Sequence, residues 1–143
     1  MSRARLFWAI ALSSAFSLLS FSIFAPLEVL ALERLGHSAF VNGLISSLFF
    51  IVVLVSGPFI HVVVRRLGHA SSYGLAKALL SSSFLVVLVD DSTAGWVVCS
   101  LLMGMGGALL WPVTEACIAE LAPQDQKGRF AGIYQTILGA FFA

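Results

Sequence analysis

Long apolar segments alternate with short polar links along the sequence, and this alternation leaves one architecture open to the chain. The segments that we expect to form helices are residues 6–32, 40–64, 70–89 and 95–121, followed by the shorter stretch 130–143. A helix crosses a bilayer with about 20 apolar residues, a length that the first four segments reach. Because lipid offers no partner to a backbone N–H or C=O, such segments must form helices.

Composition excludes a water-soluble domain. Hydrophobic residues make up 59% of the sequence and charged residues only 10%, whereas soluble domains carry about 25% charged residues. The net charge of +1 and the lack of a long basic run also argue against a nucleic-acid partner. We therefore predict an all-α, polytopic bundle of membrane helices that is surrounded by the lipid bilayer.

The last segment, 130–143, is shorter than a membrane crossing requires. Ending there would leave a carboxylate within the hydrocarbon, which is costly. We expect four full transmembrane helices and a truncated fifth, so that the chain is part of a longer protein. The alternative is a complete four-helix protein with a tail that lies on the membrane surface.

The basic residues predict the orientation of the helices, because cytoplasmic loops are enriched in Lys and Arg. With four crossings, most of the basic residues fall on one side: Arg3, Arg5, Arg65, Arg66, Lys127 and Arg129. We therefore expect a cytoplasmic N-terminus that continues into an uncleaved first helix. The acidic pair Asp90 and Asp91 should face the outer side.

A cluster of small residues lies in the middle of the segment 95–121. Gly104, Gly107 and Ala108 provide a small-residue face that lets another helix backbone come close. A phosphate-binding loop is excluded for these glycines, because they lie mid-membrane without a preceding strand. We expect them to be helix-packing residues.

The segment continues after this cluster with Trp111, Pro112 and Glu115. A helix that only fills lipid needs none of these residues. A proline inside a helix frees a backbone carbonyl. An acid at membrane depth is costly and is usually functional. We expect these three residues to line a cavity for a solute or an ion.

The first segment carries a related combination near its C-terminal end, Pro26 and Glu28. Because the two segments cross the membrane in opposite directions, this pair is expected on the opposite side of the membrane. Interrupted helices at matching positions of inverted repeats indicate a transport site, although coincidence would also produce this pattern. Ser13, Ser17 and Ser20 form a polar stripe at helical spacing, which suits either close helix packing or a cavity wall. We include Ser17, Pro26 and Glu28 among the candidate cavity residues.

Lys77 and Glu115 lie at similar depths, each about 10 Å from the expected cytoplasmic end of its helix. A buried ion pair between them would lower the cost of placing both charges in the membrane. Alternatively, Lys77 reaches the interface and Glu115 faces a wet cavity. Glu115 itself is either a proton or cation carrier or a structural acid.

Candidate catalytic or metal-binding groups are not readable in the sequence. The histidines His37, His61 and His69 have no second ligand at metal spacing, and Cys99 and Cys117 lie in one apolar segment without a ligand cluster. The sequence predicts no catalytic residue, no metal, no cofactor and no enzyme activity.

The link between the second and third segments resembles that of the major facilitator superfamily. The superfamily pattern there is Gly-x-x-x-Asp-Arg-x-Gly-Arg-Arg/Lys, and residues 61–70 align with it. Arg66 and Gly68 match. His61 replaces the first Gly, Arg65 replaces the Asp, and the following basic pair is lost. The resemblance implies that Arg65, Arg66 and Gly68 form a gating turn.

The segment 95–121 is similar to the YcaD-like branch of this superfamily, which consists of uncharacterised bacterial inner-membrane transporters. The similarity lies in the run from Gly107 to Glu115 and in the polar turn with Lys127 and Arg129. Drug–proton antiporters carry an Arg at the position of Ser100. Its replacement weakens an antiport interpretation.

The resemblance implies twelve helices in two halves built from inverted repeats, and residues 1–143 would form part of the N-terminal six-helix domain. It also implies secondary active transport of a small solute by alternating access, in the inner membrane and together with a C-terminal half. The chain alone would be inactive. The alternatives are a membrane assembly or sensor protein without transport and a membrane-embedded enzyme.

Overall fold

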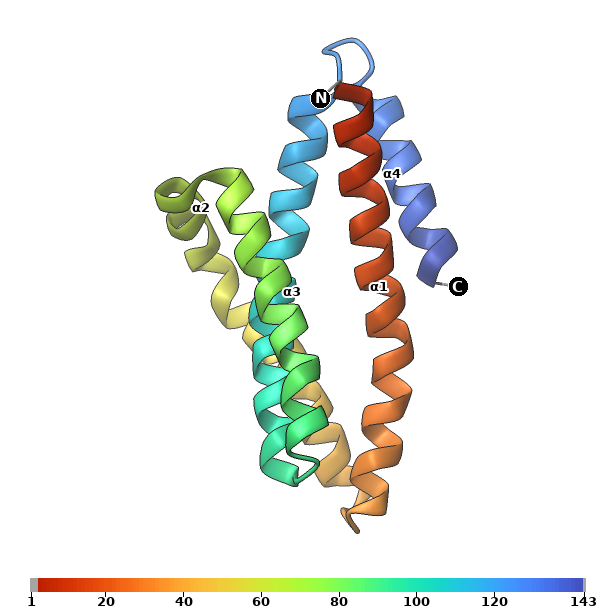
Figure 1. The fold of residues 1–143 in the computed structure, drawn as a ribbon, viewed down its shortest axis with the longest axis vertical. Coiled ribbons are helices and arrows are strands. Elements are labelled where there is room, and N and C mark those ends of the chain that lie inside the picture. The colour runs from red at the N-terminus through yellow and green to blue at the C-terminus, as the bar shows by residue number, and fades with distance from the viewer. Residues whose placement is uncertain (1–2, 143) are drawn as a thin grey trace. The chain divides into compact units, whose positions relative to one another are not determined.

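The computed structural model describes the backbone of residues 3–142, and the side chains of this range except those at positions 4, 141 and 142. This part of the chain is all-helical. Its helices are α1 (Arg3–Arg34), α2 (Ala39–Val89), α3 (Thr93–Leu121) and α4 (Lys127–Phe142) (Figure 1). The all-α prediction is confirmed for these residues, and Ala143 of the expected fifth segment lies outside them.

The expected count of five helices is not matched, because the segments 40–64 and 70–89 belong to the single element α2. Only Gly68 leaves the helical conformation inside it, with φ 77° and ψ 164°. Glycine adopts a positive φ at little cost, so one residue replaces the longer link that the basic stretch suggested. Figure 1 shows α2 folding back on itself, so that its two halves run in opposite directions.

Three of the helices are long and apolar enough to cross a membrane: α1, α2 and α3. With 51 residues, α2 would extend about 77 Å as a straight rod. This length exceeds twice the bilayer core of about 30 Å, so the reversal at Gly68 gives each half one crossing. By contrast, α4 has 16 residues in the described range.

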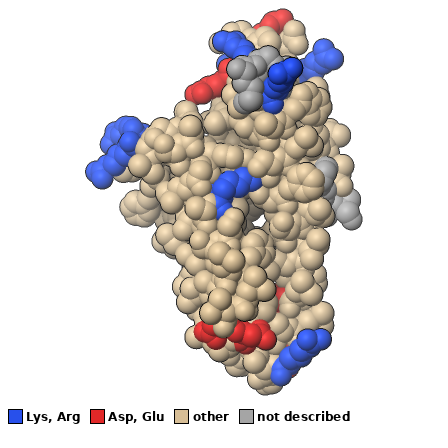
Figure 2. Space-filling view, viewed as in Figure 1, with Lys and Arg blue, Asp and Glu red and all other residues tan. Residues whose placement is uncertain are grey.

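Large apolar side chains cover much of the outer surface, as a lipid environment requires. Phe40, Leu54 and Leu88 each expose more than three quarters of their surface. Figure 2 shows that most of the visible surface carries neither acidic nor basic side chains. The membrane-spanning character of the protein follows from these apolar helices.

The described residues form two compact units. The first combines α1 up to Phe24 with the chain from Pro112 onward, and the second is Ala25–Trp111. A cluster of buried side chains from α1, α3 and α4 forms the core of the first unit: Phe7, Ala11, Ile118 and Tyr134. The ring of Phe130 packs edge-on against Phe7, with 4.9 Å between the ring centroids.

The second unit is organised around the glycines of α3. A Cβ atom built on Gly104 would lie 2.8 Å from the carbonyl oxygen of Phe49, in the first half of α2. A Cβ atom on Gly106 would lie 3.1 Å from the carbonyl oxygen of Ala76, in the second half. Because these glycines carry no side chain, both halves of α2 can approach α3 until the helix backbones are in contact.

The polar links hold the helix ends of the second unit together. Ser38 caps α2 by accepting a hydrogen bond from the backbone N–H of Val41 at 3.4 Å. His37 Nε2 lies 2.6 Å from Thr93 Oγ1 and so connects the start of α2 to the start of α3. Hydrogen bonds from Ser92 to Asp90 lower the pKa of this carboxyl, which keeps it charged in the link between α2 and α3.

We predict that Gly104→Ala destabilises the fold by about 1–3 kcal/mol, because the added methyl group meets backbone that cannot rotate away. Reversible unfolding in mixed detergent micelles measures this effect. The matched control is Gly74→Ala in α2, where an added Cβ meets nothing within 4 Å. Its helix propensity predicts a gain of up to about 1 kcal/mol. Equal stability of the two variants would contradict the packing account.

Candidate functional site

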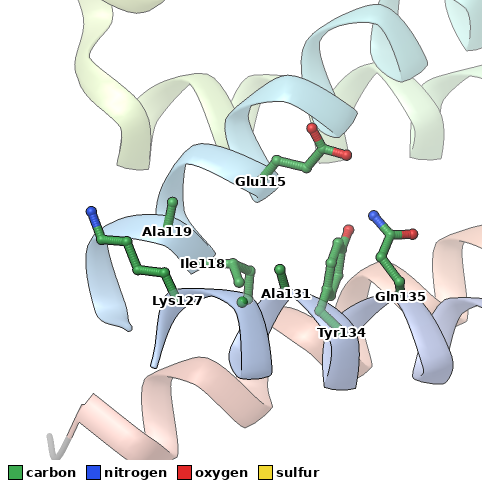
Figure 3. Close-up of a pocket in the computed structure, with 8 residues that line it drawn as sticks. Glu115, Ile118, Ala119, Lys127, Ala131, Tyr134 and Gln135 are labelled. Atoms are coloured by element: carbon green, nitrogen blue, oxygen red, sulfur yellow. The ribbon is translucent and has the colours of Figure 1, made fainter. Parts of the chain in front are cut away.

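A pocket in the first unit lies between the second half of α3 and α4. Its volume is about 470 Å³, within the range of roughly 300–1,000 Å³ that is typical of small-molecule sites. Glu115 lies in its wall, and Figure 3 shows Tyr134 and Gln135 extending from α4 toward the space beside the carboxylate. The remaining wall consists of Ile118, Ala119, Lys127, Gly128 and Ala131.

Helical spacing places these side chains on two facing surfaces. On α3, Glu115, Ile118 and Ala119 recur at the interval of one helical face, as do Lys127, Ala131 and Gln135 on α4. Sequence reasoning identified Glu115 but missed the polar residues of α4. Lys127 was assigned to the link before Phe130, whereas α4 begins at Lys127, so the face formed by Lys127, Ala131 and Gln135 was not recognised.

The pocket combines complementary polar groups within an apolar protein. The carboxylate of Glu115 is exposed to it, and in Figure 3 the ammonium group of Lys127 extends at the opposite end. The Tyr134 hydroxyl and the Gln135 amide can both donate and accept hydrogen bonds. A small polar solute or a cation could be bound by this set of groups.

Residues next to Glu115 fix the position of α3 in the first unit. Thr114 is fully buried, and its Oγ1 lies 3.5 Å from Oγ of the buried Ser14 in α1. Pro112 lies inside the helix and is exposed. Trp111 belongs to the second unit, where its ring packs edge-on against Phe49 at 6.0 Å between centroids.

The candidate residues of α1 lie in different surroundings. Ser17 Oγ donates to the carbonyl oxygen of Ser13 at 3.1 Å, so its hydroxyl bonds within its own helix. Pro26 is exposed. Glu28 is buried, with 6% of its surface exposed, and Oε1 accepts a hydrogen bond from Ser100 Oγ at 2.7 Å. From the sequence, Ser100 was noted only as the position at which drug–proton antiporters carry an Arg, and its contact with Glu28 was not predicted.

The other candidates lie on α2. The Lys77 ammonium sits over the ring of Tyr73, 5.3 Å from its centroid, in a cation–π geometry. Lys77 belongs to the second unit and Glu115 to the first, so their pairing stays a prediction. Arg65 and Arg66 are exposed and directly precede the reversal of α2.

Comparison with known proteins identifies the family. The sequence model of the Major Facilitator Superfamily matches residues 10–143. The chain belongs to the Major Facilitator Superfamily. The resemblance inferred from residues 61–70 and from the segment 95–121 is thereby confirmed.

Two relatives in this superfamily illustrate the extent of the match. The uncharacterised MFS-type transporter YfkF of Bacillus subtilis (strain 168) is 27% identical over 137 residues, which cover 96% of this chain and 35% of YfkF. The uncharacterised MFS-type transporter YcaD of Salmonella paratyphi A is 24% identical over 125 residues, covering 86% of this chain and 33% of YcaD. The chain therefore spans about a third of the length of these relatives.

Labelling of single cysteines tests whether the pocket contains water in a bilayer. In a background with Cys99→Ala and Cys117→Ala, we predict that Gln135→Cys reacts with a hydrophilic maleimide severalfold faster than Thr136→Cys. Gln135 lines the pocket, whereas the adjacent exposed Thr136 does not. The rates are measured in proteoliposomes with the reagent on both sides. Equal rates would show that the pocket is closed to water.

Proposed function

We propose that the chain is part of a secondary active transporter that moves a small solute across the membrane by alternating access. The single observation that carries this proposal is the exposure of Glu115 to a pocket that it shares with Tyr134 and Gln135 of α4. A carboxylate at membrane depth is retained at a cost, and it usually marks a solute or proton path. Membership of a transporter superfamily supports the same function and disfavours an assembly or sensor protein.

The transporter would contain a second half that this chain does not include. The match to about a third of each relative's length supports a partial N-terminal domain. Its partners would be the small solute, the lipid bilayer and the C-terminal half. Without that half there is no opposing wall for alternating access, so we expect residues 1–143 alone to be inactive in transport.

We propose the inner membrane as the location, with a cytoplasmic N-terminus. The positive-inside rule supports this orientation, because Arg3 and Arg5 begin α1 and Arg65 and Arg66 precede the reversal of α2. Asp90 and Asp91 would then face the outer side. In this orientation, Arg65, Arg66 and Gly68 form the proposed cytoplasmic gating turn.

Within the transporter, Glu115 would contact the solute or carry a coupling ion, with Trp111 and Pro112 shaping the neighbouring wall. Pro112 cannot donate a hydrogen bond to the preceding turn of α3. This local weakening would allow the helix to bend as the cavity opens to alternate sides. Lys77 would balance the charge of Glu115 in one of these states, and Glu28, Pro26 and Ser17 would belong to the wall that α1 contributes.

The test of this function is Glu115→Gln in the complete transporter. The substitution keeps the shape and removes the charge, so we expect ion-coupled solute uptake or efflux to be lost while folding is retained. Substrates are first found by a thermal-shift screen, and flux is then measured in proteoliposomes. The matched control is Glu120→Gln, an exposed acid of the same helix that does not line the pocket.

Normal transport by a folded Glu115→Gln variant would remove Glu115 from the mechanism. Loss of transport in both variants would point to a general effect of charge on α3. Only loss that is specific to Glu115 supports the proposed role.

A further inference from the structure

A buried carboxylate in the second unit is bonded to a hydroxyl of α3. Glu28 exposes 6% of its surface, and Oε1 accepts a 2.7 Å hydrogen bond from Ser100 Oγ. Ser100 Oγ also lies 3.1 Å from the carbonyl oxygen of Trp96. A hydroxyl has only one proton to share between these two acceptors. A buried charge needs pairing or several hydrogen bonds to offset its desolvation.

Two further polar atoms are buried on α2 near its start. Within the described part of the chain, neither Asn42 Oδ1 nor Ser46 Oγ has a hydrogen-bond partner. Asn42 exposes only 4% of its surface. An unbonded buried polar atom loses its hydrogen bonds to water without replacement, so two of them one turn apart require an explanation.

The register of the helices brings these groups to one level. The beginnings of α2 and α3 are neighbours, as the contact between His37 and Thr93 shows. About three turns further along both helices, Gly104 approaches the carbonyl oxygen of Phe49. The two helices are therefore parallel over this interval (Figure 1). By residue number, the interval contains the unbonded atoms of α2 and the Ser100 hydroxyl of α3.

The groups also share the facing surfaces of these helices. Asn42 and Ser46 precede Phe49 by seven and three residues, which places them on the face that packs against α3. Ser100 precedes Gly104 by one turn and lies on the glycine face of α3. Because Ser100 binds Glu28 of α1, three helix segments of this unit meet at the same level.

We infer that this junction is a binding site for a sodium ion. Its candidate ligands are oxygen atoms only: the Glu28 carboxylate, Asn42 Oδ1, Ser46 Oγ and Ser100 Oγ. Hard cations prefer such oxygens. With a single carboxylate, a monovalent ion leaves the buried site neutral, whereas a divalent ion would leave an uncompensated charge. The inference concerns binding and does not depend on the proposed transport activity.

Thermal unfolding of the full chain in detergent tests this site. Melting temperatures are compared in NaCl and in choline chloride at equal ionic strength and constant pH. An ion that binds only the folded state raises the melting temperature with its concentration. We expect a saturable rise in NaCl for the wild type, and loss of this rise in Glu28→Gln and in Asn42→Ala.

The control is Ser72→Ala, which removes another buried and unbonded hydroxyl of α2 near its reversal, away from the junction. This variant should keep the full sodium effect. If Glu28→Gln does not fold, Asn42→Ala and sodium titration calorimetry of the wild type decide the question. A wild type with equal melting temperatures in both salts overturns the site. A sodium effect that persists in both ligand variants, or stability that responds to pH and not to sodium, also overturns it.

Discussion

The close approach of α3 to the backbone of α2 is the contact on which the second unit depends. In lipid, helices gain little from hiding apolar surface, so they associate through close packing and polar contacts. Gly104 and Gly106 leave no side chain between α3 and the carbonyl oxygens of Phe49 and Ala76. Because these carbonyls belong to the two halves of α2, the reversal at Gly68 and the position of α3 belong to one packing arrangement.

The same solvent makes each polar group in the apolar helices expensive, and the structure places these groups in defined surroundings. Glu28 is buried and bonded to Ser100. Glu115 instead faces a pocket that also contains Gln135 and the hydroxyl-bearing Tyr134. The first environment suits a tightly held counter-ion, and the second suits a solute or proton that enters and leaves. Two acids of one chain thereby lie in different surroundings.

Apolar length was sufficient to predict the membrane helices, and the motifs at residues 61–70 and in the segment 95–121 were sufficient to predict the family. The role of the segment around Glu115 stays a prediction. The helix count was wrong because a single positive φ at Gly68 replaces a loop, and backbone geometry of this kind is not visible in a basic stretch. The hydrogen bond between Glu28 and Ser100 could not be predicted, because it joins residues that are far apart in the sequence. The α4 wall of the pocket was not predicted, although Tyr134 and Gln135 lie inside the segment 130–143, because their position opposite Glu115 depends on how α3 and α4 pack.

Solid-state NMR of the chain in bilayers tests the packing of α3 against α2 most directly. Selective ¹³C labelling of Gly and Val should give a cross-peak between the Cα of Gly104 and the side-chain carbons of Val52, whose Cβ lies 2.7 Å from the position of a Cβ on Gly104. We predict this cross-peak at short mixing times, and its disappearance in Gly104→Ala confirms the assignment. A bilayer sample without this contact, in which both residues are otherwise observed, would contradict the account.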